Sequence, residues 1–416
     1  MSSHQKKITL FIILLITFID WTGVGLVYPM FSSMLFEEGF LLPISTTSDL
    51  QKGVWLGVLL AAMPVAQFFS SPIIGALSDQ KGRKPLLLVT LVMSFVGYCI
   101  AFWGASSHSI ALLILSRIVV GIGAGNMAVV SASLADISPD AEKVKNYGYL
   151  NMAYGLGFTL GPYLGGKLSV ISSLGGFAAP FLFAAAASLF ALAMVQWGFK
   201  ETFTVSAKAK ISLAKGAKSF MKAFRIPELK VLFLCVFLFC FGWSFFWEFI
   251  PVHWIKEYKF NSTQIGTLYA YAAGFYALSC GLFIKPLAKL IKPTGSYFFG
   301  LIGLGAAIGL FLIDSSYFGL WVYIPLQQIL ISLLFPTATA MVSMQVKDDA
   351  QGEMLGTLSS VTASAFAFSP LVSGFLVGAS HWSPIWAGMI SMFIAAVIFY
   401  FGCIKNKYSF RSLISN

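Results

Sequence analysis

Twelve long apolar segments follow one another along the chain, separated by short polar stretches. Each holds about 20 mostly apolar residues, the length that an α-helix needs to cross the hydrocarbon core of a bilayer. A strand of a membrane barrel is about half as long, so helices are the expected spanning element. The predicted spans are 8–30, 53–77, 85–105, 109–134, 146–168, 177–198, 229–252, 264–288, 293–312, 317–345, 354–379 and 383–403.

The composition supports this pattern. Apolar residues make up 58% of the 416 positions and charged residues 10%, whereas a soluble domain carries roughly 25% charged residues. So few charges cannot cover the surface of a soluble fold of this length. The five cysteines lie within apolar runs without a CxxC pair, so we expect packing residues rather than disulfides or metal ligands. The composition excludes a soluble enzyme, a disordered chain and a secreted disulfide scaffold.

The distribution of lysine and arginine predicts the orientation of the spans. If the N-terminus lies in the cytoplasm, few of the 27 basic residues fall in loops on the outer side. Those few are Lys52, Lys167, Lys256 and Lys259. Because basic loops stay in the cytoplasm, both termini are expected there. The basic residues are scattered over short loops, so the net charge of +11 does not indicate a nucleic-acid partner.

A basic stretch divides the spans six and six. It predicts an N-terminal six-helix half at 1–198, a cytoplasmic linker at 199–228 and a C-terminal half with a short tail at 229–416. Lysines at near-helical spacing in the linker suit an amphipathic helix on the anionic inner leaflet, and a solvated linker is an equal alternative. Two six-helix halves in parallel register are typical of one large class of secondary transporters.

The loop between the second and third spans carries the string GALSDQKGRKP at 75–85. Its glycines permit a tight turn, and Asp79 can cap a helix or pair with Arg83. The string resembles the signature loop of the major facilitator superfamily and meets every fixed position of it. The resemblance implies a latch that joins the two halves in the outward-facing state, formed by Gly75, Asp79, Gly82 and Arg83. A basic turn that only sets the topology is the alternative.

The fifth span contains the string GLGFTLGPYLGG at 155–166. Gly157, Gly161 and Gly165 are four residues apart, so they form a stripe that lets another helix approach closely. Pro162 frees a backbone carbonyl and bends the helix. Together with Gly166, these residues resemble the antiporter motif of the twelve-span drug/proton antiporters. Ordinary helix packing would explain the glycine stripe alone.

Two charged residues lie deep in the spans. Asp20 is about 18 Å from the cytoplasmic end of span one, and Arg117 is about 12 Å from the outer end of span four. In a hydrocarbon core of about 30 Å these depths coincide. A lone charge there costs a few kcal/mol, so a pair facing an interior cavity is predicted, with a purely structural ion pair as the alternative.

Both charges also belong to strings that resemble family motifs. Span four reads LILSRIVVGIGAGN at 113–126 and resembles the family's fourth-helix motif, whose arginine is implicated in proton coupling. Span one reads DWTGVGLVYP at 20–29 and resembles the first span of tetracycline/proton exporters. The resemblance therefore implies proton coupling through Asp20 and Arg117.

Glu248, near the outer end of span seven, is the third candidate for a buried charge and for proton coupling. Ser244 shares its helix face, and Trp243 and Trp247 lie beside that face. A cavity carboxylate flanked by aromatic rings would suit a flat or cationic organic molecule. An interfacial glutamate in an aromatic belt is the equal alternative. Asn126, Asn151, Gln327 and Gln328 are further candidates that could form hydrogen bonds in the substrate cavity, although polar contacts between helices explain each about as well. Trp21 and Tyr28 are also candidates for the cavity.

These features predict a secondary active transporter that works by alternating access. The resemblance implies proton-coupled export of an amphiphilic organic compound or drug across a bacterial inner membrane. A carrier of a physiological small molecule, such as a siderophore, metabolite or sugar, is the alternative within the class, in either direction. A membrane enzyme is disfavoured because no HExxH, GxSxG or P-loop string occurs. The two matching halves and the latch loop disfavour a channel.

The prediction of a secondary active transporter also indicates the expected partners. They are a small organic substrate, protons and the lipid bilayer, and the protein is expected to be a monomer without cofactor or metal. No ATP-binding loop occurs in the sequence, so an ion gradient should drive transport. Protons suit Asp20 and Glu248, with sodium as the alternative ion.

Overall fold

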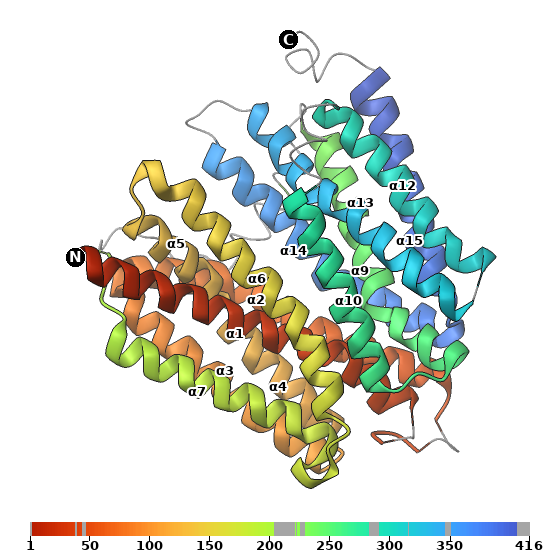
Figure 1. Cartoon of the computed structure of the whole chain (residues 1–416), viewed down its shortest axis with the longest axis horizontal. Helices are drawn as coiled ribbons and strands as arrows, with labels where there is room; N and C mark the ends of the chain where they lie inside the picture. Colours follow the sequence, from red (N-terminus) through yellow and green to blue (C-terminus); the bar gives the residue numbers. More distant parts are fainter. Residues whose placement is uncertain are drawn as a thin grey trace. The chain divides into compact units, whose positions relative to one another are not determined.

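The structure is a computed structural model of the chain, and it describes residues 2–37, 40–43, 47–203, 221, 223–224, 229–282, 291–314, 316–345 and 351–405. Within these ranges every regular element is a helix (Figure 1). This confirms the predicted all-α fold. Most of the predicted linker at 199–228 lies outside the described residues.

The first five spans are longer than predicted, because polar turns extend the apolar runs at their ends, whereas the sixth begins two residues later than predicted. The fourth span is interrupted by a short 3₁₀ turn, η1, between α4 and α5. The elements are α1 (Ser3–Phe36), α2 (Asp49–Lys81), α3 (Arg83–Ser106), α4 (Ile110–Gly123), η1 (Ala124–Asn126), α5 (Met127–Ile137), α6 (Asp140–Leu168) and α7 (Ala179–Gly198).

Six further long helices follow. They are α9 (Lys230–Tyr258), α10 (Ser262–Leu282), α12 (Pro293–Ile313), α13 (Tyr317–Met344), α14 (Gln351–Ala379) and α15 (Ser383–Phe399), which a π-helical turn continues (Tyr400–Lys405). Counting α4 to α5 as one span, the described helices match the predicted twelve. Among the described residues, ten helical spans are long and apolar enough to cross a membrane, and α6 and α10 are not among them. Both carry many glycines and polar residues, which lower the mean hydropathy.

The backbone contacts divide the chain into two compact units. The first comprises 1–47, 58–215 and 259–270, and the second comprises 48–57, 216–258 and 271–416. The start of α2 groups with the second unit, where Asp49 pairs with Lys256 at 2.6 Å and an added Cβ on Gly57 would lie 2.5 Å from the Pro370 carbonyl oxygen. The boundaries of the three segments inferred from the sequence stay a prediction.

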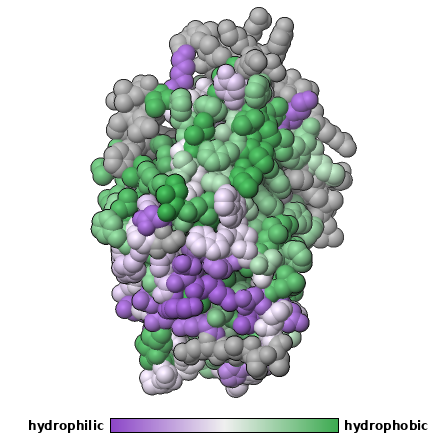
Figure 2. All heavy atoms as spheres, turned by 90° about the vertical axis from the view of Figure 1, so that its right-hand side faces the viewer, coloured by the Kyte–Doolittle hydropathy of each residue, from purple (hydrophilic) through white to green (hydrophobic). Residues whose placement is uncertain are grey.

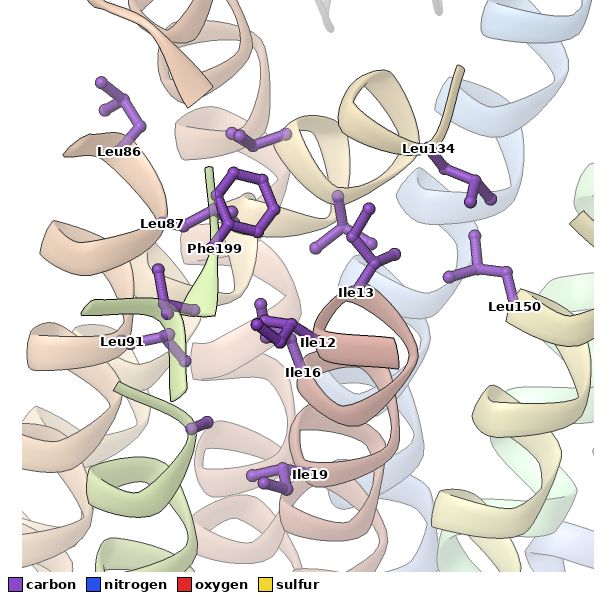
Figure 3. Close-up of a cluster of buried hydrophobic side chains, with 14 of the residues drawn as sticks. Ile12, Ile13, Ile16, Ile19, Leu86, Leu87, Leu91, Leu134, Leu150 and Phe199 are labelled. Carbon is purple, nitrogen blue, oxygen red and sulfur yellow. The ribbon is translucent and has the colours of Figure 1, made fainter. Parts of the chain in front are cut away.

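A core of aliphatic side chains holds α1 in the first unit. Ile12, Ile13 and Ile16 of α1 point into it together with Leu87 and Leu91 of α3 (Figure 3). All five are fully buried. This packing anchors the half of α1 that precedes Asp20, so the position of that carboxylate is set by an apolar core.

Many large apolar side chains point away from the helices. Trp197, Phe299 and Phe318 are among the most exposed. One face of the molecule shows such apolar surface above a band of hydrophilic residues (Figure 2). Extensive exposed apolar surface is expected where lipid, not water, covers a protein.

Candidate functional site

Two glycines let the turn between α4 and α5 pack closely against α2 and α3. A Cβ on Gly123 would lie 2.9 Å from the Thr90 carbonyl oxygen on α3, and one on Gly125 would lie 2.7 Å from the Ile74 side chain on α2. Because only glycine leaves room for these contacts, the 3₁₀ turn sits close to both helices. This packing fixes the backbone position of Asn126, the last residue of the turn.

Asn126 reaches Asp20 on α1. Its Nδ2 donates a hydrogen bond to Oδ2 of Asp20 at 2.7 Å. Asn126 is fully buried, and its Oδ1 has no hydrogen-bond partner among the described residues. The structure therefore brings the predicted coupling carboxylate and one predicted cavity residue into direct contact.

Tyr98 and Arg117 complete this cluster, which we call the Asp20 cluster (Asp20, Tyr98, Arg117 and Asn126). The hydroxyl end of Tyr98 lies against the backbone of Gly23, where a Cβ would overlap it. Tyr98 is within electrostatic reach of both Asp20 and Arg117. Direct pairing of those two charges stays a prediction. Sequence reasoning missed Tyr98, because a lone tyrosine in an apolar span carries no motif.

Arg117 is buried, with 4% of its surface exposed. Its Nε faces the carbonyl oxygen of Leu59 at 3.4 Å, and its guanidinium carbon lies 5.8 Å from the centre of the Phe31 ring. A buried guanidinium needs such acceptors and aromatic faces, since an isolated charge at this depth is costly.

The glycine stripe of α6 lies against α1. An added Cβ on Gly161 would lie 2.5 Å from the Thr22 carbonyl oxygen and 2.9 Å from Cα of Gly25. Gly157 and Gly165 are equally close to the α1 backbone. The stripe is thus a site of backbone-to-backbone packing, while the antiporter role of Gly157, Gly161, Pro162, Gly165 and Gly166 stays a prediction.

Aromatic rings line the same two helices beside the stripe. The Trp21 ring centre lies 4.1 Å from that of Tyr154, and Tyr154 is parallel to Phe158 at 6.2 Å. The Tyr28 ring lies 5.9 Å from Phe158. The predicted cavity residues Trp21 and Tyr28 are therefore joined through two rings that the sequence did not single out. Asn151, also on α6, is exposed.

Glu248 lies in the second unit, inside α9. It is 4% exposed and accepts a hydrogen bond from the Ser244 hydroxyl at 2.9 Å. Trp243 and Trp247 stack with ring centres 5.1 Å apart, and both are buried. Such burial does not fit a glutamate among lipid headgroups. Whether Glu248 faces a substrate cavity stays a prediction.

Gln327 and Gln328 are both buried on α13. Gln327 donates from Nε2 to the carbonyl oxygen of Ala307 on α12 at 3.2 Å, so it joins two helices. Its Oε1, like Nε2 of Gln328, has no partner among the residues that the structure describes. Substrate contact by either residue stays a prediction.

The predicted latch forms a network of charges at the turn between α2 and α3. Arg83 forms an ion pair with Asp79 and a second one with Asp136 of α5, whose Oδ2 lies 3.2 Å from Nε. Gly82 has φ of +98°, a backbone conformation that favours glycine. A Cβ added to Gly75 would make only an ordinary van der Waals contact, with Cβ of Ala128 at 3.5 Å. The latch role of these residues stays a prediction.

Residues that follow α7 close over this turn. Glu201 accepts hydrogen bonds from the backbone N–H of Arg83 at 2.8 Å and of Lys84 at 3.0 Å, so it caps α3. The ring of Phe203 lies 4.4 Å from the guanidinium carbon of Arg83. The sequence offered no signal for this contact, because Glu201 is 118 positions from Arg83 and belongs to no motif.

The comparisons with known proteins agree with this geometry. Residues 10–292 and 232–411 match the sequence profile of the Major Facilitator Superfamily. The chain belongs to the major facilitator superfamily. It is 28% identical over 401 residues to the tetracycline resistance protein, class H, of Pasteurella multocida, covering 92% of each chain. It is 28% identical over 394 residues to the quinolone resistance protein NorA of Staphylococcus aureus, covering 94% of this chain and 95% of NorA.

A solved structure supports the fold of this major facilitator protein. A D-xylose–proton symporter superposes with a TM-score of 0.75 at 14% sequence identity, covering 94% of this chain and 96% of the symporter. The predicted family, the twelve-helix fold and the exclusion of an enzyme are thereby confirmed. The protein is a multi-pass membrane protein and a secondary transporter of small molecules, related to drug-efflux proteins.

Proposed function

We propose that this transporter exports an amphiphilic organic compound across the bacterial inner membrane in exchange for protons. The Asp20 cluster is the observation that carries the proposal. It holds a half-buried carboxylate in the first unit, beside an amide donor at 2.7 Å and within electrostatic reach of Tyr98. The resistance proteins to which the chain is similar, named for tetracycline and for quinolones, support the choice of a drug-like substrate.

Asp20 would carry the proton. Water that reaches the carboxylate from the outer side delivers a proton, and water that reaches it from the cytoplasm removes it. Burial disfavours the charged carboxylate and the positive charge of Arg117 favours it, so a change in water access changes which form is stable. Alternating access would then couple proton entry to substrate exit.

The aromatic rings and the buried carboxylate of Glu248 would bind the substrate. Trp21 and Tyr28 in the first unit and the stacked pair Trp243 and Trp247 in the second present aromatic faces, which suit flat organic molecules. Glu248 adds a negative charge that would attract a cationic group. Asn126, Asn151, Gln327 and Gln328 would contribute hydrogen bonds, and Glu248 is also a second candidate for proton binding.

Two further elements would control the conformational cycle. Gly75, Asp79, Gly82 and Arg83 would stabilise one access state as a latch, and the glycine stripe with Pro162 would keep α1 and α6 tightly packed so that protons do not leak. We further propose a monomer with both termini in the cytoplasm, built from halves at 1–198 and 229–416 and a linker at 199–228.

Efflux assays in a strain depleted of its own exporters test the proposal. Tetracycline, norfloxacin and ethidium are loaded into cells, and efflux is followed before and after a proton ionophore collapses the gradient. We expect ionophore-sensitive efflux of at least one compound, lost in Asp20→Asn. Efflux that persists without a proton gradient would refute proton coupling. Failure to move any of a broad panel of such compounds, with proton-linked uptake or export of a sugar, metabolite or siderophore instead, would refute drug export.

A further inference from the structure

We infer that Asn126 is a positioning residue that stabilises Asp20 in both of its protonation states. Its Nδ2 donates to the carboxylate, as observed, and its Oδ1 accepts from the carboxyl group once a proton has been added. The inference rests on the proposed role of Asp20 as the proton carrier, and it adds a residue to that site.

The unpartnered oxygen of Asn126 is the observation that prompts it. Asn126 is fully buried, yet among the described residues only one end of its carboxamide has a partner, through the bond from Nδ2 to Asp20 at 2.7 Å. Buried polar atoms without a partner are uncommon, because they have lost their hydrogen bonds to water. An acceptor held next to a titratable carboxylate has an obvious second partner, which is that carboxylate's own proton.

The exchange between the two states needs only a rotation of the side-chain amide. The oxygen and nitrogen of a carboxamide have nearly the same size, and the torsion that interchanges them has a broad, roughly two-fold profile. A half turn places Oδ1 near the present position of Nδ2, about 2.7 Å from Oδ2 of Asp20. That distance is ordinary for both an N–H···O and an O–H···O hydrogen bond.

The proton balance is simple. A proton from water adds to Oδ2 of Asp20, and the new O–H donates to Oδ1 of Asn126. When the proton leaves to water on the other side, the amide turns back and Nδ2 donates to the carboxylate again. No backbone movement is required, because the glycines that flank the 3₁₀ turn keep Asn126 close to α2 and α3.

Of the other members of the cluster, Arg117 cannot form this pair of bonds. Arg117 has only donors, so it stabilises the carboxylate and offers nothing to the protonated form. Tyr98 can donate or accept, and its hydroxyl end packs at Gly23 on α1. Within the described parts of the chain, Asn126 donates a hydrogen bond to Asp20 and its Oδ1 has no partner.

An infrared titration tests the inference without any substrate. The wild-type protein, labelled with ¹³C-asparagine and reconstituted in lipid vesicles, is titrated with acid. The carboxyl band of Asp20 is assigned by its loss in Asp20→Asn, and the side-chain amide band of Asn126 by its loss in Asn126→Ser. We expect the amide band to shift at the same midpoint pH as the carboxyl band. An amide band that does not respond, or responds at a different pH, overturns the inference.

Transport by variants gives a second test. In proteoliposomes with ethidium as the probe, we expect Asn126→Leu to lower proton-driven transport at least tenfold, a larger loss than that of downhill ethidium exchange. Asn126→Ser, whose hydroxyl can donate and accept, should recover a substantial part of the proton-driven rate. Asn146→Leu is the matched control, because Asn146 is also buried and also uses Nδ2, to the Ser138 hydroxyl at 2.8 Å. It should stay within twofold of wild type.

The outcomes separate the two proposals. If Asp20→Asn abolishes proton-driven transport while Asn126→Leu does not, Asn126 is not a positioning residue and the proposed function stands. If Asp20→Asn remains coupled, or if the wild-type spectrum lacks a titrating Asp20 carboxyl band, the proposed proton carrier is wrong. Equal losses of driven transport and downhill exchange in Asn126→Leu, without recovery in Asn126→Ser, would indicate a structural role only.

Discussion

Adding one methyl group to α6 should change the stability of the fold in opposite directions at two positions six residues apart. In Gly161→Ala, the new Cβ would lie 2.5 Å from the Thr22 carbonyl oxygen and 2.9 Å from Cα of Gly25. Both atoms belong to the α1 backbone and cannot rotate away. In Gly155→Ala, nothing lies within 4 Å of the new Cβ. The two substitutions share the same helix, and they differ in this contact and in the proline that follows Gly161, because a Cβ before Pro162 further disfavours the helical backbone.

The expected difference in stability between the two variants follows from that comparison. Replacing glycine by alanine inside a helix gains about 1 kcal/mol at either position, and this gain cancels in the difference. At Gly161 the helices must separate by about 0.5 Å or more before the contact is tolerable, and such overpacking typically costs about 1–3 kcal/mol. We therefore expect Gly155→Ala to be as stable as wild type or more so, and Gly161→Ala to be about 1–3 kcal/mol less stable than Gly155→Ala.

The measurement is denaturant-induced unfolding in detergent micelles, followed by tryptophan fluorescence, with proton permeability of proteoliposomes as the functional readout. Gly161→Ala should unfold at lower denaturant concentration than Gly155→Ala. Gly161→Leu, with a larger side chain, should in addition lose transport or leak protons. Equal stability of the two alanine variants would refute the reasoning from backbone contact, and normal transport by Gly161→Leu would leave the antiporter motif without support.

Three further predictions concern the charged sites. Asp20→Asn should abolish substrate accumulation against a gradient but retain downhill exchange. If Asp20 and Arg117 act as a unit, the double variant with Arg117→Ala should transport no less than the slower single variant, and additive losses would argue against a unit. Gly82→Ala should slow turnover without loss of insertion, because φ of +98° costs a residue with a Cβ about 1 kcal/mol or more, whereas Gly75→Ala should be mild. Glu201→Ala should lower the stability of the fold by about 1 kcal/mol, because α3 loses its cap, and it should slow turnover more than Glu201→Gln, which keeps a hydrogen-bond acceptor. Equal turnover of the two variants would exclude a role of Glu201 in the latch.

Local sequence strings were enough to predict the architecture. Hydropathy marks most spans, because a helix needs about 20 mostly apolar residues to cross the bilayer. The loop at 75–85 and the glycine string at 155–166 predicted the family, which the comparisons confirm. The same strings singled out Asp20 and Arg117, because charges inside apolar runs are rare and costly.

The extent of individual helices was less predictable. The string SRIVVGIGAGN reads as one continuous span, yet the helix is interrupted by the 3₁₀ turn at Ala124–Asn126. The turn packs closely against its neighbours, since a Cβ on Gly123 would lie 2.9 Å from the Thr90 carbonyl oxygen of α3 and one on Gly125 would lie 2.7 Å from the Ile74 side chain of α2. Depth arguments placed Asp20 and Arg117 at one level of the membrane, but they could not place Tyr98 within reach of both.

The sequence by itself determined the twelve helices, their predicted orientation and the family, because each of these depends on residues that are close together in the chain. Only the tertiary structure decided the partners of the functional side chains. Asn126 donates to Asp20 across 106 positions, and Glu201 caps α3 across 118 positions. Helix period and hydropathy say which face of a helix is buried, but not which residue of another helix meets it, because that choice depends on how closely the glycine-lined backbones pack.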